Sequence, residues 1–360
     1  MELLQDAAEF WPRARADVLA ARQRVYVQAL TFEGDAAGRE VAATLAASPA
    51  PDRRVLVDCF TKHVVSDRLV RWPGNLLDPA LLEEVRATER MRRDLERVGV
   101  GWRFVGPLGP LLLRAPARNH KKLVLVDERV AYVGGINFSD HNFAWRDLML
   151  RIEGREAVRF LGEDFLRTWE GRPAASSARL PGLELHALDG RANEVLFEEV
   201  ALSAVDEARE RIYVECAYLT SPFLERLGAA GRRGVRVVAV TPEANNWGLV
   251  RDVLRWPPAT RGIDVRLYRG RMTHMKALLV DDAVLVLGSA NFDLWSYHFQ
   301  GEYLARVTDP TLIDDFRNRV VAEGLRGSRP VEDPAGPVRG GLARLALRSL
   351  EALTLRLSGA

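Results

Sequence analysis

The sequence predicts an α/β protein built as two similar lobes, and three observations support this fold class. The chain has 360 residues, which is enough for two domains of ordinary size. A nonapeptide that combines His, Lys and Asp at fixed spacing occurs twice, as NHKKLVLVD at 119–127 and as THMKALLVD at 273–281. Strand-like and helix-like segments also follow one another in the same order in both halves, which is typical of a duplicated domain rather than of a solenoid.

The first half is expected to contain a helical segment at 1–20 and a lobe at 21–175. Within the lobe, β-branched and apolar residues form short runs that are typical of buried strands, and segments with helical periodicity separate them. We expect strands in ARQRVYVQAL (21–30), RRVLVDCF (53–60) and GVGWRFVG (99–106), and a helix in GREVAATLAAS (38–48).

The second half repeats this order after a linker at 176–182, which lies in a stretch rich in Pro, Gly, Ala and Ser. Its lobe is expected at 183–330. The matching segments are ARERIYVECA (208–217), SPFLERLGAAGRRG (221–234), GVRVVAVTP (234–242) and GIDVRLYRG (262–270). This alternation predicts, in each lobe, a mostly parallel mixed sheet that is flanked by helices.

Some segments have no counterpart in the other half. The first half is longer by about 33 residues, and the extra residues lie within 63–84 and 107–118. The apolar stretch at 107–113 is either a loop that contacts lipid or a segment buried under the first lobe. The tail at 331–360 carries regularly spaced Leu and Arg residues and predicts a basic amphipathic helix, which either lies in an anionic membrane interface or packs on the second lobe.

The composition narrows the class of protein. The net charge of +2 provides no field that favours nucleic acid. Cys59 and Cys216 lie in apolar, strand-like runs and are expected to be free thiols, in keeping with a reducing compartment. The N-terminus lacks the apolar core of a signal peptide, and the sequence has no run of 18 apolar residues. We therefore expect a cytoplasmic protein.

Lysine is rare in this chain and concentrated in the repeated nonapeptides. Only four of the 51 basic residues are Lys, and three of these are Lys121, Lys122 and Lys276. A Lys ammonium is a compact charge that fits beside an anion, whereas the Arg guanidinium is a wide planar fork. Because Lys122 and Lys276 occupy the same position in both copies, the pattern indicates a site that needs a small cation.

Each nonapeptide is expected to form the first strand of a hairpin. Residues two apart on a strand face the same side, so His120 projects together with Lys122. With the turn centred on residues 128–129, His120 lies opposite Asn137. The second copy groups His274, Lys276 and Asn291 in the same way. Each half therefore offers an imidazole, an ammonium and a carboxamide.

This cluster suits an oxyanion better than a metal. No second His or carboxylate stands at ligand spacing on the same face, so we expect no metal and no other cofactor. The Lys charge and the Asn N–H donors suit a phosphodiester. If the two clusters face each other, one His attacks phosphorus while the other, protonated, donates to the leaving oxygen. One imidazole cannot do both in the same step, which accounts for the repeat.

Four carboxylates accompany the histidines. Asp147 and Glu302 enter apolar runs, where an unpaired carboxylate is costly, so we expect them to orient the histidines. Asp127 and Asp281 end the nonapeptides at the expected turns, off the His and Lys face, where a structural role is favoured over proton transfer.

The paired motifs, followed by GGIN and GSAN, resemble those of the phospholipase D superfamily. Within it, RNHKKLVLVDERVAYVGGINFSD, WRDLMLRIEG and ANFDLWSYHFQGE are similar to bacterial cardiolipin synthases, and the resemblance covers roughly residues 20–325. It implies two lobes with the active site at their interface, a phosphohistidine intermediate and no metal. The implied catalytic set is His120, Lys122, Asp127, His274, Lys276 and Asp281, and the implied phosphate-binding set adds Asn137, Ser289 and Asn291.

The chain also departs from this family. Membrane-spanning N-terminal helices, frequent in cardiolipin synthases, are absent from the sequence. Trp295 and Gln300 stand where the family usually has Arg and Asn, and Gly135 stands where the second half has Ser289. These differences leave the acceptor and the substrate open.

We therefore expect an enzyme, a phosphatidyltransferase of cardiolipin-synthase type that moves a phosphatidyl group to an alcohol such as phosphatidylglycerol. The alternatives are a phospholipase D or other phosphodiesterase that uses water, including a nuclease, and a non-catalytic membrane-binding protein. The intact motifs argue against the last, and the net charge argues against a nuclease. The expected partner is an anionic phospholipid at the inner face of the cell membrane, bound peripherally by a monomer.

Overall fold

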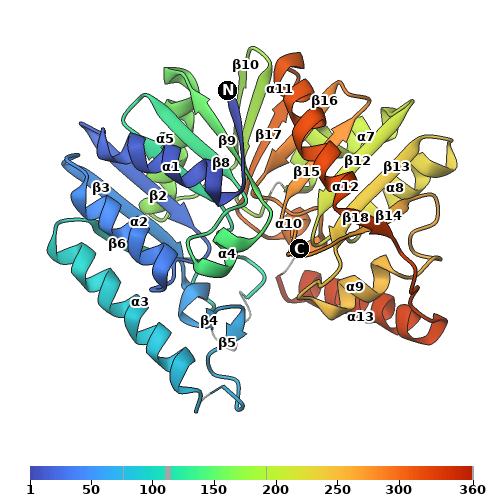
Figure 1. The fold of residues 1–360 in the computed structure, drawn as a ribbon, viewed down its shortest axis with the longest axis horizontal. Coiled ribbons are helices and arrows are strands. Elements are labelled where there is room, and N and C mark those ends of the chain that lie inside the picture. The colour runs from blue at the N-terminus through green and yellow to red at the C-terminus, as the bar shows by residue number, and fades with distance from the viewer. Residues whose placement is uncertain (76, 110–114, 192, 359–360) are drawn as a thin grey trace.

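The computed structural model describes residues 1–75, 77–109, 115–191 and 193–358, and it has two lobes, each built on one large sheet (Figure 1). The first lobe has seven strands. In sheet order they are β1 (Glu2–Gln5), β9 (Leu148–Glu153), β8 (Val130–Gly134), β7 (Leu123–Val126), β2 (Arg24–Ala29), β3 (Asp52–Asp58) and β6 (Gly101–Val105).

The second lobe has a nine-stranded sheet with the same central order. Its strands are β10 (Ser176–Leu180), β11 (Leu183–Ala187), β17 (Tyr303–Val307), β16 (Val284–Gly288), β15 (Lys276–Val280), β12 (Arg211–Cys216), β13 (Arg236–Pro242), β14 (Asp264–Tyr268) and β18 (Ser328–Pro330). The duplication predicted from the sequence is therefore present strand by strand.

The prediction of mostly parallel sheets is wrong in detail. Only the β2–β3–β6 pairings and the β12–β13–β14 pairings are parallel. The other pairings are antiparallel. Three-residue turns join β7 to β8 and β15 to β16, and the longer segments 135–147 and 289–302 return the chain antiparallel as β9 and β17.

Helices flank both sheets. In the first lobe they are α1 (Asp6–Leu19), α2 (Ala36–Ala47), α3 (Pro79–Arg97), α4 (Asp140–Ala144) and α5 (Arg155–Trp169). In the second lobe they are α6 (Asn193–Phe197), α7 (Ser203–Glu207), α8 (Phe223–Arg232), α9 (Gly248–Leu254), α10 (Leu294–His298), α11 (Pro310–Asp315), α12 (Ala322–Arg326) and α13 (Pro337–Ser358). None of the helices in the described part of the chain is long and apolar enough to cross a bilayer.

The segment expected to be a linker is instead an edge strand. Residues 176–180 form β10, which pairs with β11 around a turn at Pro181–Gly182. Small and polar side chains do not prevent strand pairing when a tight turn returns the chain beside itself. The helical segment expected at 1–20 is present as α1, preceded by the short strand β1, which pairs with β9.

A continuous hydrophobic core joins the lobes. It contains Leu125 and Phe165 of the first lobe and Leu279, Leu287 and Phe316 of the second. Burial of an aliphatic or aromatic side chain of this size stabilises a fold by about 1.5–3 kcal/mol. The two lobes therefore hold a fixed relation, which a site at their interface requires.

The unmatched segments have defined places. Residues 63–84 form the small hairpin β4 (Val64–Val65) and β5 (Arg68–Leu69) and the start of α3. The predicted lipid-contacting or buried loop at 107–113 lies mostly outside the described residues. The tail forms α13, which packs on α9 through Ala343 and Leu347 and also leaves apolar side chains exposed. Cys59 and Cys216 are free thiols, as predicted.

Candidate active site

The two nonapeptides lie at the interface between the lobes, where β7 and β15 begin. The hairpin register differs by one residue from the prediction, because the turns enclose three residues rather than two: Val126 pairs with Val130, and Val280 pairs with Val284. Asp127 and Asp281, the first residues of the two turns, have left-handed φ values of 57° and 50°. Continuing the pairing places His120 opposite Ile136 rather than opposite Asn137.

Backbone bridges connect each nonapeptide to the opposite lobe. Asn119 pairs with Gly301, and Arg146 pairs with Thr273, both in parallel. The His120 amide donates to the Gly301 carbonyl at 2.8 Å, and the His274 amide donates to the Arg146 carbonyl at 2.7 Å. Each catalytic segment is thereby held next to the residue that precedes the other lobe's buried acid.

The two histidines are oriented across the interface. His120 Nδ1 lies 2.8 Å from Glu302 Oε1, and His274 Nδ1 lies 2.7 Å from Asp147 Oδ2. All four side chains are buried. The structure thus brings together the predicted histidines and the predicted acids, but each acid belongs to the lobe opposite its histidine. Spacing within one half gave no signal of this exchange.

The acids are supported differently. The hydroxyl of Ser289, predicted to bind phosphate, donates to Glu302 Oε2 instead, and Ser296 Oγ donates to Glu302 Oε1 at 2.8 Å. Asp147 Oδ1 accepts from the Leu148 amide at 2.8 Å. Ser296 was not anticipated from the sequence.

The lysines lie beside the histidines. Lys122 Nζ donates to the His120 carbonyl at 2.7 Å, and Lys276 Nζ donates to the His274 carbonyl. Burial lowers the pKa of both ammonium groups, that of Lys122 to about 7. Both cations are therefore held without a direct carboxylate contact among the described residues, in a place where an anion would stabilise their charge.

The two histidine–acid pairs differ in how the protein shifts the pKa values of their groups. Burial lowers the pKa of both imidazoles, and the charges of Lys122 and Lys276 act in the same direction on both, but at His120 the charge of Glu302 acts in the opposite direction. Burial also raises the pKa of Asp147 to about 6. Burial acts in the same direction on Glu302, but His120, Lys122 and the hydrogen bond from Ser289 outweigh it and lower the pKa of that carboxyl.

The two asparagines are not equivalent. Asn137 Oδ1 accepts from the amides of Leu30 and Thr31, at 3.2 and 3.4 Å, so its carboxamide braces the chain after β2. Asn291 lines a cavity next to His120. Of the two asparagines, Asn291 is the one that borders this cavity.

Asp127 and Asp281 lie at the far ends of β7 and β15 from the histidines. Asp127 accepts from the amides of Arg22, Gln23 and Arg24, and Asp281 accepts from those of Arg209, Glu210 and Arg211. These hydrogen bonds lower the pKa of both carboxyls despite partial burial, which raises it. The structural role favoured for them in the sequence agrees with these contacts.

Lys121, the third lysine of the two nonapeptides, has a different role. Lys121 forms a buried ion pair with Asp164 of α5, at 2.7 Å, and Tyr303 of the opposite lobe donates to the same carboxylate at 2.6 Å. On the other side of the interface, Arg146 pairs with Glu215 at 2.8 Å. These buried polar contacts fix the lobes beside the site, and isolated sequence positions did not reveal them.

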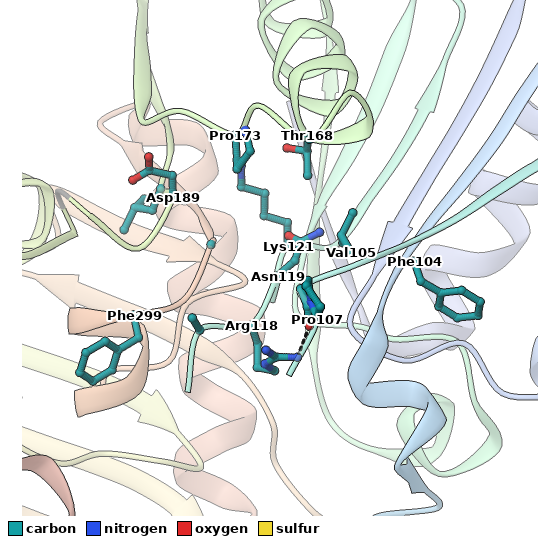
Figure 2. A pocket seen from close by; sticks show the side chains of 15 residues that line it. Phe104, Val105, Pro107, Arg118, Asn119, Lys121, Thr168, Pro173, Asp189 and Phe299 are labelled. Atoms are coloured by element: carbon teal, nitrogen blue, oxygen red, sulfur yellow. Dashed lines mark hydrogen bonds between the residues drawn. The ribbon is translucent and has the colours of Figure 1, made fainter. Parts of the chain in front are cut away.

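Two cavities flank the segment that carries His120. The first, of about 420 Å³, is lined by His120 and Asn291 and has aromatic walls from Tyr218, Trp247 and Trp295. The second, also of about 420 Å³, lies on the other side of this segment and is lined by Asn119 and Lys121 (Figure 2). Because alternate residues of an extended chain face opposite sides, His120 faces only the first.

Among the described residues, one group of three acids, Glu33, Asp35 and Glu84, is close enough to share an ion, and it contains none of the motif residues.

Comparison with known proteins shows similarity to cardiolipin synthases. Residues 202–321 match the family model described as "Cardiolipin synthase, PLD-like domain". Cardiolipin synthase B of Escherichia coli K12 is 26% identical over 321 residues, which cover 81% of this chain and 72% of that protein. The chain is therefore similar to cardiolipin synthases and, over residues 202–321, to their PLD-like domain.

Further similarities concern other proteins and the fold. Cardiolipin synthase 2 of Staphylococcus epidermidis is 26% identical over 261 residues, covering 64% of this chain and 53% of that protein. The phosphatidylserine synthase of Haemophilus influenzae has the same fold, with a TM-score of 0.71 at 16% identity over 98% of this chain and 94% of that one. The polyphosphate kinase of Porphyromonas gingivalis gives 0.60 at 15% identity, over 98% of this chain and 53% of that one.

Proposed function

We propose that this protein is a phosphatidyltransferase of cardiolipin-synthase type. It transfers a phosphatidyl group from one phospholipid to an alcohol, such as the head group of phosphatidylglycerol, through a phosphohistidine. One observation carries the proposal: two buried histidines, each oriented by a carboxylate of the opposite lobe and each accompanied by a Lys. The relatives named cardiolipin synthase support the substrate class.

In the first half-reaction, His120 Nε2 attacks phosphorus and the bond from phosphorus to the head-group oxygen breaks. The leaving oxygen takes the proton from His274 Nε2. In the second, the acceptor hydroxyl gives its proton to His274 and its oxygen attacks phosphorus, which breaks the phosphorus–nitrogen bond and frees His120. Glu302 and Asp147 accept from Nδ1, which leaves each Nε2 available for these steps. The order of the two histidines follows the family resemblance.

Substrate charge activates the site in this scheme. Burial lowers the pKa of Lys122, Lys276 and both histidines, which disfavours their protonated forms. A phosphodiester brings one negative charge into this low-dielectric space and favours the protonated forms of its neighbours. Substrate binding therefore supplies the protonated His274 that the first step requires.

The aromatic cavity suits the apolar end of the donor. It reaches His120 and is walled by Tyr218, Trp247 and Trp295, whereas the family pattern has Arg at the position of Trp295. We expect the glycerol backbone and the first part of the acyl chains to lie there, with the phosphate near Asn291.

The product decides between alcohol and water as acceptor. Purified protein is incubated with phosphatidylglycerol vesicles, and the lipids are analysed by mass spectrometry. We expect cardiolipin and free glycerol in equal amounts, and neither with His120→Asn protein. Phosphatidic acid without cardiolipin would mean that water is the acceptor, and no product from any phosphodiester lipid would refute the catalytic proposal.

A further inference from the structure

The inserted hairpin region of the first lobe, residues 63–77, exposes large apolar side chains that its own packing does not require. Val65, Val70 and Leu81 form a separate small core that holds the region on α3. On the outside, Leu69 is 53%, Trp72 62% and Leu77 91% exposed. We call these three residues, with the hairpin that carries them, the apolar arm. The exposed side chains of the apolar arm are not part of this small core, so they are available to a partner.

Helix α13 presents a second such surface. Its inner face packs on α9, yet Val338, Leu342, Leu345 and Leu353 on its outer side are between 54% and 73% exposed. A terminal helix that only docked on its lobe would turn polar residues outward. The outer side of α13 therefore also lacks a partner within the described chain.

The two surfaces lie on either side of the mouth of the aromatic cavity. Phe60, three residues before the arm, and Trp247, which directly precedes α9, both line that cavity. At the tip of the arm, Asp67 Oδ2 accepts from Asn246 Nδ2 at 3.2 Å, so the arm touches the second lobe next to Trp247. Figure 1 places β4, β5, α9 and α13 along the same side of the molecule.

The charges near these surfaces indicate what covers them. Exposed arginines accompany the apolar side chains: Arg71 on the arm, and Arg348 and Arg356 on α13. Basic residues beside Trp and Leu suit an anionic phospholipid surface, where the apolar groups enter the head-group region and the cations meet lipid phosphates. A second copy of this chain would instead bring like charges together.

We propose that the apolar arm and the outer side of α13 together form a docking surface for an anionic bilayer. Docking holds the mouth of the aromatic cavity against the membrane, so a lipid reaches His120 without leaving the bilayer completely. The inference rests on the proposed function for the nature of the substrate, but the docking itself requires no turnover.

The test separates docking from catalysis by using His120→Asn protein for binding. Its co-sedimentation is measured with vesicles of phosphatidylglycerol and phosphatidylcholine and with vesicles of phosphatidylcholine alone. We expect Trp72→Ser with Leu77→Ser, and separately Leu342→Ser with Leu345→Ser, each to reduce binding to the anionic vesicles by about tenfold or more. The matched control is Val98→Ser, which changes an exposed aliphatic residue at the far end of α3.

The same surface changes are then made in active protein. Turnover of a short-chain, monomeric phosphodiester should stay within about twofold of the unmodified protein, because the site is untouched. Vesicle binding that survives in either pair, or that falls equally in the Val98→Ser control, would overturn the proposal. A concentration-dependent dimer that the same changes abolish, seen by light scattering with vesicle binding unaffected, would assign the surface to a second copy and also overturn it.

Discussion

The two half-sites are copies in geometry but differ in chemistry. Each has a histidine whose Nδ1 lies within 2.8 Å of a carboxylate from the other lobe. In one, the carboxylate is Glu302, which is hydrogen-bonded by Ser289 and Ser296 and has a lowered pKa. In the other it is Asp147, whose pKa is raised to about 6. Duplication supplied two imidazoles, and divergence around them supplied unequal proton affinities.

A single position explains much of the divergence. A Cβ atom at Gly135 would lie 2.1 Å from Asp147 Oδ1, so that carboxylate occupies space that a side chain would need. At the equivalent position, the hydroxyl of Ser289 donates to Glu302 Oε2. A glycine therefore accompanies the carboxylate that orients His274, and a serine accompanies the carboxylate that orients His120.

The largest effect should come from the histidines themselves. We expect His120→Asn and His274→Asn each to reduce transfer by about 10⁴-fold or more, since neither role has a substitute. With a nitrophenyl phosphodiester, whose leaving group needs no proton, His274→Asn should accumulate an adduct on His120 and His120→Asn none. Intact-mass measurement after alkaline quenching reads this directly. An adduct found only on His274 would reverse the roles and thereby sharpen the comparison.

The acids should show a smaller loss and different pH responses. We expect Asp147→Asn and Glu302→Gln to lower kcat by about 10²- to 10³-fold through misorientation of the imidazole. Because the pKa of Asp147 is raised to about 6, this carboxylate gains its proton as pH falls through 6, and activity should fall with it. The Glu302 pKa is lowered, so it stays ionised there. The pH–rate profile should therefore lose its acid limb near 6 in Asp147→Asn but not in Glu302→Gln.

Exchanging the supporting residues tests whether the two arrangements are interchangeable. Gly135→Ser should displace Asp147 and lower kcat by about 10- to 100-fold, whereas Ser289→Ala removes one hydrogen bond to Glu302 and should cost about tenfold or less. The measurement is kcat on vesicles and on a soluble substrate, with thermal unfolding as a control for folding. Equal effects of the two changes would contradict the asymmetry.

The sequence predicted the residues of the site better than their partners. His120, Lys122, His274 and Lys276 follow from strand alternation, which is local and repeated. The pairing of His120 with Glu302 depends on how the lobes meet, and no spacing within either half encodes that. The sheets are less parallel than predicted because β9 and β17 also add antiparallel pairs beside the predicted β7–β8 and β15–β16 hairpins, and the direction of these two strands depends on tertiary packing.

The carboxylates at the hairpin turns should affect folding rather than turnover. Asp127→Ala or Asp281→Ala removes an acceptor for three backbone amides, and each should lower the free energy of unfolding by about 1–2 kcal/mol. Their pKa values are lowered, so this contribution is present at neutral pH and is lost as pH falls below the usual Asp range. Urea unfolding at pH 7 and pH 3 should show the difference shrinking at the lower pH, with kcat at 20 °C unchanged.

The smallest effect should come from removing metal. Neither half-site offers a ligand set among the described residues, so incubation with EDTA should leave turnover unchanged for both half-reactions. If chelation abolished turnover and a divalent ion restored it, the reaction would need a metal ion and this prediction would be wrong.

The exchange of acids between lobes also bears on how such a chain arose. A single lobe carries a histidine without its acid and an acid without its histidine, so alone it is chemically incomplete at both points. In a dimer of two identical lobes related by a two-fold axis, each lobe would supply the acid for the histidine of the other lobe. Once the two lobes are joined in one chain, each copy can change its sequence independently. Separate expression of residues 1–172 and 173–360 should accordingly give two inactive proteins, and mixing them should restore function only as far as the shared core can reassemble.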